Sequence, residues 1–197
     1  MVQVKSFYPL LIASLCVGLI AVCASVLARP MIIYNATDSL PHGFYRVAGQ
    51  QTYERGDLVV FPVPEQVQHL VLERGWLRAD SYLIKPVAAI SGDCMTVAAG
   101  QVVVNNERFG CVKKSDKEGL PMPELALNTR LSRGEIAVLQ KSDHSFDSRY
   151  FGLIDAREII GTAVPLWLFS EPASSNASVD VESQEECGKK KGDGSAR

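Results

Sequence analysis

One serine and one lysine have surroundings that point to chemistry. Ser39 lies in Asn35-Ala-Thr-Asp-Ser-Leu-Pro-His-Gly-Phe-Tyr45, where glycine and proline restrict the backbone around a turn. Lys85 lies in Tyr82-Leu-Ile-Lys-Pro-Val-Ala-Ala-Ile90, a run with no other charge. A serine hydroxyl is a weak nucleophile until a neighbouring base takes its proton. The pair therefore predicts acyl transfer with Ser39 as nucleophile and Lys85 as base.

Lys85 can act as a base only if it is shielded from water. A solvated lysine has a pKa of about 10.4, whereas burial lowers the pKa by up to about 3–5 units. The alternative is that Lys85 ends a strand and extends its ammonium group into water. The three histidines are weaker candidates: His69 falls in a predicted helix, His42 could turn toward or away from Ser39, and His144 has no evident role.

A third polar segment reads Ser142-Asp-His-Ser-Phe-Asp-Ser-Arg-Tyr-Phe-Gly152. Taken singly, its polar residues are typical of solvated turns. Together they could form a buried hydrogen-bond network that orients an amine, with Asp147 and Arg149 as an internal ion pair.

Short β-branched segments must position these residues. They are bounded by Gly, Asp or Asn and lie at 58–61, 82–84, 96–97, 101–104, 135–139 and 160–164. Ala99-Gly100 and Asn105-Asn106 supply turns around the strand at 101–104. One helix is predicted over 65–75, ending at Gly75. The fold class is mainly β with little α, as a coiled sheet or partial barrel.

Residues 7–28 form an uncharged apolar run that predicts a transmembrane anchor. As a helix the run is roughly 33 Å long, enough to cross the hydrocarbon core. A cleaved secretory signal is the alternative, because Val26 and Ala28 make an acceptable cleavage site. Residues 1–6 are then a cytoplasmic start and 30–169 the exported domain. Residues 170–197 lose all apolar periodicity and are predicted to be a disordered tail.

Composition narrows the partners. The net charge of −2, without a basic cluster, gives no case for nucleic-acid binding. No His, Cys or Asp cluster has metal-ligand spacing, so neither a metal nor another cofactor is expected. In an oxidising compartment a disulfide between Cys94 and Cys111 is expected, with two reduced, buried thiols as the alternative. Cys187 lies in the tail and is expected to be unpaired.

These segments, in this order, resemble the type I signal peptidase family, and most closely its conjugative-transfer (TraF-type) subgroup. The resemblance rests on four boxes: Ser39-Leu-Pro-His-Gly-Phe-Tyr45, Arg55-Gly-Asp-Leu-Val-Val-Phe61, Tyr82 to Asp93 with its terminal Gly-Asp, and Ser145-Phe-Asp-Ser-Arg-Tyr-Phe-Gly152. It spans residues 7 to about 166. Upstream of Ser145 the chain departs from housekeeping members, which carry a longer Gly-Asp-Asn-Arg-Asp-Asn run. We also expect it to lack the large extra domain of many housekeeping members, since Lys85 follows Ser39 by only 46 positions.

The resemblance implies a role for each matching residue. Ser39 would be the acylating nucleophile and Lys85 the general base. The Ser39 N–H and the Thr37 hydroxyl would form the oxyanion hole. Ser145 would orient the lysine amine. Asp147 would pair with Arg149 or contribute to the site.

The implied function is a membrane-anchored serine endopeptidase that processes an exported precursor, the conjugative pilin, at the bacterial inner membrane with its catalytic domain in the periplasm. Residues 7–28 would contact the lipid. Nothing in the sequence decides between hydrolysis and pilin cyclisation. The alternatives are a general signal peptidase I and a non-catalytic anchored scaffold. A self-cleaving repressor of the same Ser–Lys type would need a DNA-binding module where this chain has its apolar run.

Overall fold

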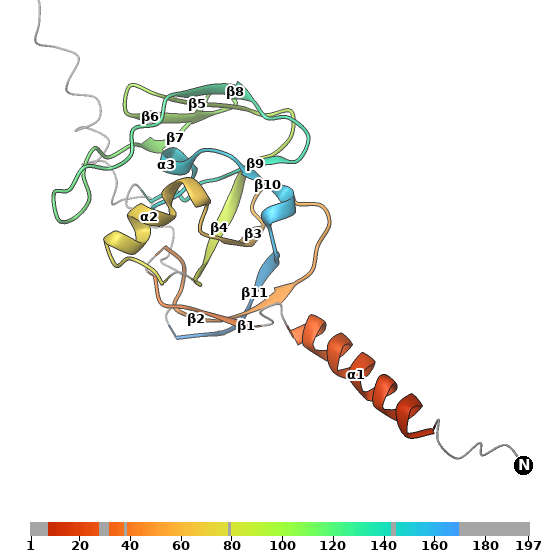
Figure 1. Ribbon diagram of the computed structural model, residues 1–197. Coiled ribbons are helices and arrows are strands. Elements are labelled where there is room, and N and C mark those ends of the chain that lie inside the picture. Colours follow the sequence, from red (N-terminus) through yellow and green to blue (C-terminus); the bar gives the residue numbers. More distant parts are fainter. Residues whose placement is uncertain (1–7, 28–31, 38, 79, 143–144, 170–197) are drawn as a thin grey trace, which may run out of the picture.

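Antiparallel sheets form most of the molecule (Figure 1). The computed structural model describes residues 8–27, 32–37, 39–78, 80–142 and 145–169. The larger sheet contains, in spatial order, β1 (Ile32–Asn35), β2 (Gly43–Ala48), β11 (Gly161–Leu168), β3 (Leu58–Pro62), β4 (Tyr82–Ala89), β9 (Glu135–Val138) and β10 (Ile154–Asp155). The smaller sheet contains β7 (Glu107–Cys111), β6 (Gln101–Val104), β5 (Cys94–Ala98) and β8 (Leu127–Arg130).

The predicted mainly β architecture is confirmed, and each predicted strand has a counterpart in β3, β4, β5, β6, β9 or β11. The predicted turns are confirmed as well. Ala99 and Gly100 have φ of 50° and 76°, and Asn105 and Asn106 have φ of 49° and 68°. Two consecutive left-handed residues are the requirement of the type I′ turns that join tight hairpins.

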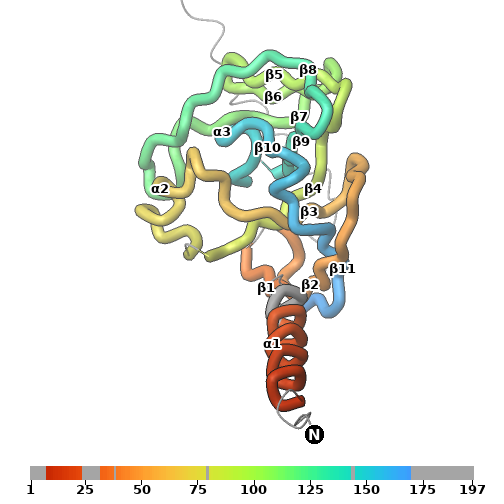
Figure 2. Tube along the Cα trace, turned by 45° about the vertical axis from the view of Figure 1, so that its right-hand side comes forward, coloured from red at the N-terminus to blue at the C-terminus, as the bar shows by residue number. Residues whose placement is uncertain are grey.

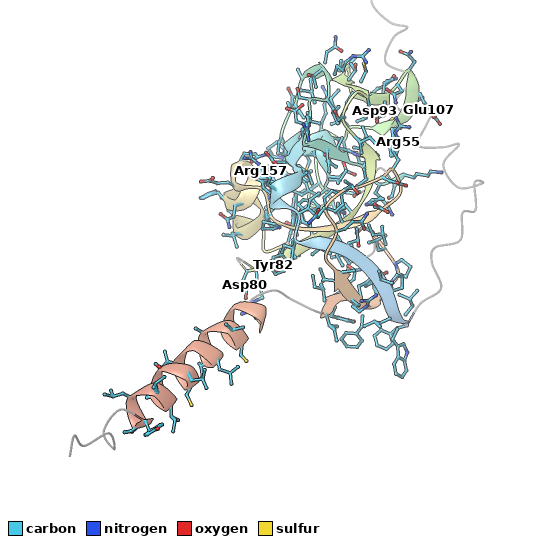
Figure 3. All side chains as sticks on the ribbon, turned by 90° about the vertical axis from the view of Figure 1, so that its right-hand side faces the viewer. Arg55, Asp80, Tyr82, Asp93, Glu107 and Arg157 are labelled. Carbon is cyan, nitrogen blue, oxygen red and sulfur yellow. The ribbon has the colours of Figure 1, made fainter. Side chains whose placement is uncertain are left out.

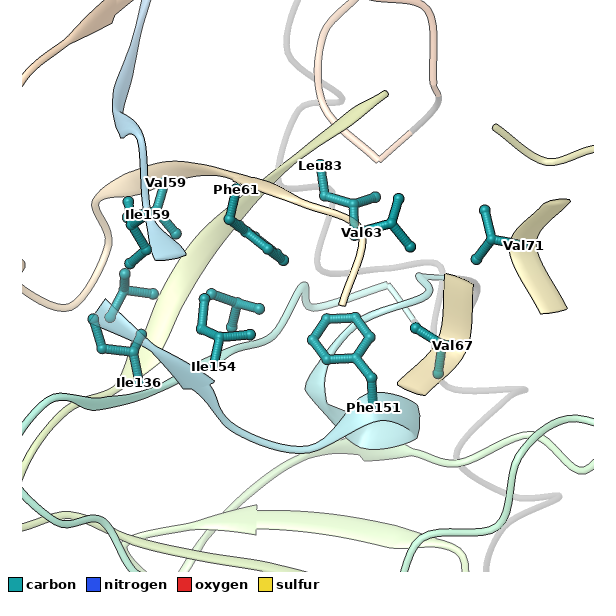
Figure 4. Packing of buried hydrophobic residues seen from close by; sticks show 12 residues of the cluster. Val59, Phe61, Val63, Val67, Val71, Leu83, Ile136, Phe151, Ile154 and Ile159 are labelled. Carbon is teal, nitrogen blue, oxygen red and sulfur yellow. The ribbon is translucent and has the colours of Figure 1, made fainter. Parts of the chain in front are cut away.

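Helix α2 (Glu65–Glu73) is the helix predicted over 65–75. Gly75 has a φ of +63°, and the N–H groups of Gly75 and Trp76 donate to the carbonyls of Leu72 and Val71. This is the Schellman arrangement that glycine permits at a helix end. The helix packs Val67 and Val71 into the apolar cluster shown in Figure 4. The short helices α3 (Ser148–Phe151) and η2 (Ala156–Glu158) complete the body.

Two glycines allow β11 to lie close against β2. A Cβ atom on Gly43 would lie 2.1 Å from the Trp167 carbonyl oxygen, and one on Gly161 would lie 2.3 Å from that of Ala48. Both contacts are with backbone, which cannot move aside like a flexible side chain. Gly43 therefore fixes where the segment carrying Ser39 enters the sheet.

The smaller sheet is held to the larger one through Asp93, which follows β4. The Arg55 guanidinium, which lies beside Asp93 in Figure 3, binds its carboxylate, with Nε donating at 2.9 Å. The Ile90 N–H and the Asn105 side chain donate to the same carboxylate. The hydrogen bond from Arg55 is the main cause that lowers the pKa of Asp93 to about 2. The Gly-Asp at the end of the Tyr82–Asp93 box therefore has a structural role, because Asp93 links the two sheets.

The structure does not join Cys94 to Cys111, so the expected disulfide between them is wrong. Cys94 begins β5 and Cys111 ends β7, with β6 lying between these strands. Two strand spacings are roughly 10 Å, whereas a disulfide needs Cα atoms within about 7 Å. The Arg108 guanidinium donates to the Cys111 sulfur at 3.1 Å. Cys187 lies outside the described residues, as does the predicted tail.

Helix α1 (Tyr8–Leu27) projects from the body beside β1 and β2 (Figure 2). It coincides with the apolar run at 7–28, so the helical part of that prediction is confirmed. Among the described residues, no helix meets the combination of length and apolar character that a membrane crossing requires. The transmembrane anchor stays a prediction.

Candidate active site

Asn35, the last residue of β1, organises the turn that carries Ser39. Its buried side-chain amide donates to the carbonyls of Thr37 and Leu40 at 3.0 Å and of Pro41 at 3.3 Å. The Tyr45 hydroxyl donates to the Pro41 carbonyl at 2.8 Å. One buried amide thus satisfies carbonyls that a helix or sheet would otherwise pair.

The hydroxyls of Thr37 and Ser39 lie 3.1 Å apart. Thr37 Oγ1 also donates to Asn35 Oδ1 at 2.7 Å. A hydroxyl has one proton, so Thr37 can only accept from Ser39. Among the described residues, no hydrogen bond joins Ser39 Oγ to Lys85. The Ser39 side chain is half-buried, and its proton points to Thr37.

Lys85 is buried in the middle of β4, with 5% of its surface exposed. Its Nζ donates to Ser145 Oγ at 2.9 Å, and Ser145 is itself buried. Burial is the largest influence on the amine and lowers the pKa of Lys85 to about 8, while Asp147 raises that pKa and Arg149 lowers it further. The water-exposed alternative for Lys85 is wrong. The predicted contact with Ser145 is present.

Asp147 and Arg149 form a completely buried ion pair, with Nε to Oδ1 at 2.8 Å. Asp147 also caps helix α3, since its Oδ1 accepts the Arg149 N–H at 3.2 Å. Arg149 donates further to the carbonyls of Cys111 at 3.0 Å and Gln140 at 2.6 Å. A buried polar network whose members are all hydrogen-bonded is rigid. The ion pair holds the turn that presents Ser145, and Asp147 reaches Lys85 only through its charge.

A cavity of about 920 Å³ brings the predicted residues together, since Thr37, Ser39, Lys85 and Ser145 all line it. The other walls come from β1, the end of α2, β4 and the segment after β7, and they include Ile33, Trp76, Leu77, Lys113, Asp116, Met122 and Phe146. The lining mixes apolar and charged side chains.

Two polar residues of this region escaped the sequence analysis. Asn35 was visible as an Asx residue at the start of a turn, a pattern typical of side-chain to backbone bonding. Gln140 gave no local signal, because its amide contacts the Ser39 carbonyl from far along the chain. Of the histidines, His69 is exposed on α2 beside Glu73, and His144 lies outside the described residues. The described residues contain no group of His, Cys, Asp or Glu that could hold a metal ion.

Comparison with known proteins agrees with this geometry. The family model described as signal peptidase, peptidase S26, matches residues 5–168. The chain belongs to the S26 signal peptidase family. Members of the S26 family are generally serine peptidases.

Within the S26 family, the chain is 30% identical over 143 residues to the plasmid transfer protein TraF of Escherichia coli. That alignment covers 67% of this chain and 80% of the relative. A solved signal peptidase I from Enterococcus faecalis is 18% identical, with a TM-score of 0.36, over 58% of this chain and 98% of that one. The resemblance to the signal peptidases and to TraF is confirmed.

Proposed function

We propose that this chain is a membrane-anchored serine endopeptidase in which Ser39 is the nucleophile and Lys85 the general base. The observation that carries the proposal is the amine of Lys85. It is buried, its pKa is lowered to about 8, and it is bonded to Ser145 in the same cavity that Ser39 lines. A lysine held in this way has the proton affinity that a base needs near neutral pH.

Acylation begins when Ser39 Oγ attacks the scissile carbonyl carbon and its proton passes to Lys85 Nζ. The carbonyl oxygen becomes an oxyanion, which the Ser39 N–H and the Thr37 hydroxyl stabilise. To donate there, Thr37 must release Asn35 Oδ1. The Ser39 proton must in turn leave Thr37 and pass to Lys85 Nζ.

Collapse of the tetrahedral intermediate breaks the peptide C–N bond, and Lys85 passes its proton to the leaving amine. Water then attacks the Ser39 ester, with Lys85 again taking a proton, and restores the hydroxyl. If the substrate's own terminal amine attacks in place of water, the product is a cyclic polypeptide.

We assign the substrate as the exported precursor of a conjugative pilin, and the location as the bacterial inner membrane with the catalytic domain in the periplasm. The name of the relative, plasmid transfer protein, supports this assignment. Exposed aromatic side chains gather near the end of β11 and on β1 and β2: Tyr34, Phe44, Trp167 and Phe169. Aromatic residues are typical of the membrane interface, and α1 joins the body at β1.

Co-expression with a pilin precursor tests the proposal. Wild-type protein should release a mature subunit, whereas Ser39→Ala and Lys85→Met should leave the precursor uncut although they are folded and inserted. Intact mass distinguishes a linear product from a cyclic one, which is lighter by one water. Retention of conjugation by Ser39→Ala would indicate a scaffold. Accumulation of many exported precursors in that variant would indicate a general signal peptidase.

A further inference from the structure

Gln140 connects the serine turn with the network behind the lysine. Its side-chain amide donates to the Ser39 carbonyl, 101 positions earlier in the chain. Its backbone N–H donates to Asp147 Oδ2 at 3.0 Å, and its carbonyl accepts from Arg149 at 2.6 Å. The side-chain group that faces a carbonyl must be the amide nitrogen, because two oxygens would repel each other.

Such a connection is needed because the sheet alone does not bring the two reactive groups together. Ser39 follows β1 and Lys85 lies on β4, and β2, β11 and β3 lie between those strands. Four strand spacings correspond to roughly 19 Å along a sheet. The serine turn must fold back over the sheet, and its final position depends on contacts made at the far side. Gln140 follows β9, which is the direct neighbour of β4.

The partners of Gln140 make it a rigid support. Asp147 and Arg149 are completely buried. Asp147 binds the backbone N–H of Gln140, and Arg149 binds its backbone carbonyl. The same ion pair belongs to the turn that presents Ser145 to Lys85. A single network thus fixes the base through Ser145 and the nucleophile through Gln140.

We propose that Gln140 is a positioning residue for acylation, which sets the alignment of Ser39 with the Lys85–Ser145 pair. The proposal rests on the proposed Ser39–Lys85 peptidase activity. A misplacement of about 1 Å costs on the order of 10²-fold in rate. Loss of this bond should therefore reduce turnover and leave substrate binding, which uses the rest of the cavity, nearly unchanged.

Gln140→Met tests the bond, since methionine has a similar length and no donor. The full-length protein in detergent micelles is assayed with an internally quenched peptide that carries Ala-x-Ala before the scissile bond. We expect kcat to fall about 10–100-fold with KM little changed. The matched control is Gln66→Met, because the Gln66 side chain also donates to a backbone carbonyl, that of Phe151 at 3.0 Å, but on α2. This control should keep the wild-type kcat.

Gln140→Glu provides a second measurement that does not depend on lost packing. The carboxylate keeps the shape of the side chain but repels the Ser39 carbonyl, so kcat should fall further than in Gln140→Met. Its negative charge also joins the network of Asp147, whose charge already raises the pKa of Lys85, so the pH–rate profile should move to higher pH. Equal kcat in Gln140→Glu and wild type would overturn the proposal. The proposal would also be overturned if the loss of kcat in Gln140→Met were explained by a lowered melting temperature. The same holds if Gln66→Met lost kcat to the same extent.

The two proposals fail in different ways. If wild-type protein gives no Ser39-dependent cleavage of the peptide, the peptidase assignment itself is wrong. If wild-type cleavage depends on Ser39 while Gln140→Met behaves as Gln66→Met does, the positioning role is wrong and the peptidase assignment stands.

Discussion

Nζ of Lys85 donates a hydrogen bond of 2.9 Å to Oγ of Ser145, and the two side chains are 60 positions apart in the chain. Both side chains are buried, so water cannot take the place of either hydrogen-bond partner. The lone pair of the uncharged amine is aimed by the direction in which its protons are held. This relationship makes Ser145 the nearest support of the base.

Ser145→Ala should therefore lower kcat by about 10–100-fold, since the amine loses the acceptor that orients it. Ser148→Ala is the matched control: it removes another buried hydroxyl of the same segment, one that accepts the Val138 N–H at 2.9 Å. We expect the control to lower the free energy of unfolding by about 1–3 kcal/mol while the folded fraction keeps its kcat. Steady-state kinetics on folded protein compare the two, and equal activity of Ser145→Ala and wild type would contradict the role of Ser145.

Activity should rise with pH through the pKa of Lys85. Because that pKa is lowered to about 8, the amine is mostly protonated at pH 7 and mostly free at pH 9. The kcat/KM of the wild-type enzyme should thus increase toward a plateau above pH 8, with its midpoint near that value. A pH–rate profile of peptide cleavage measures the midpoint. A midpoint at about 6.5, the usual pKa of histidine, would mean that a residue other than Lys85 is the base.

Stability should change with pH for the same reason. The folded-state pKa of Lys85 is lower than its unfolded value of 10.5, so the unfolded chain binds more protons between about pH 8 and 10.5. The free energy of unfolding should then rise with pH across that window, by about 3 kcal/mol at most. Urea unfolding at pH 7.5 and 9.5 compares wild type with Lys85→Met, which should lose this part of the slope. If the free energy of unfolding has the same pH dependence in both proteins, the surroundings of Lys85 do not disfavour its charged form.

The serine turn should depend on the donor groups of Asn35. Asn35→Asp replaces the amide that bonds three carbonyls with an acceptor that repels them, so we expect a loss of kcat of about 10²-fold and a destabilisation of about 1–3 kcal/mol. Asn128→Asp is a suitable control, because Asn128 accepts from the Thr96 hydroxyl on the exposed smaller sheet. In peptide-cleavage and urea-unfolding measurements, the control should have a kcat and a free energy of unfolding close to those of wild type. Similar losses in both variants would point to a general effect of added charge.

Gly43→Ala should destabilise the body by about 1–3 kcal/mol, because the new methyl group meets the Trp167 carbonyl. Gly49→Ala, only six positions later, introduces the same methyl group into open space and should be close to neutral. Denaturant midpoints of the two variants give a direct comparison. Equal midpoints would mean that β2 and β11 can separate without cost.

Cys94 and Cys111 should not be cross-linked to each other when the protein is unfolded and alkylated without reductant, since β6 lies between the strands that carry them. Peptide mass spectrometry after non-reducing digestion tests for the linkage. A peptide pair joined through Cys94 and Cys111 would contradict the strand order of the smaller sheet.

The sequence predicted the parts of the site that depend on local chemistry. Lys85 stands alone in an apolar strand, Ser39 lies in a turn rich in proline and glycine, and these patterns follow from burial and backbone restriction. The polar segment around Asp147 was predicted as an ion-paired network, and it is one. Helix α2 was predicted through its glycine end.

Contacts between distant segments could not be predicted in this way. The bond from Gln140 to Ser39 depends on how β9 and the serine turn meet, which no spacing reveals. The disulfide expectation failed for a similar reason, since the position of β6 between the two cysteine-bearing strands depends on the sheet order. Strands β1 and β2, which flank Ser39, carry too little alternation to stand out in the sequence.

The wide separation of these partners also determines when the proposed cleavage becomes possible. During synthesis Ser39 emerges early, whereas Gln140 and Ser145, which contact Ser39 and Lys85, are made about a hundred residues later. By the proposed mechanism, a nascent or truncated chain carries an inert serine, and bond cleavage becomes available only after the last strands have docked.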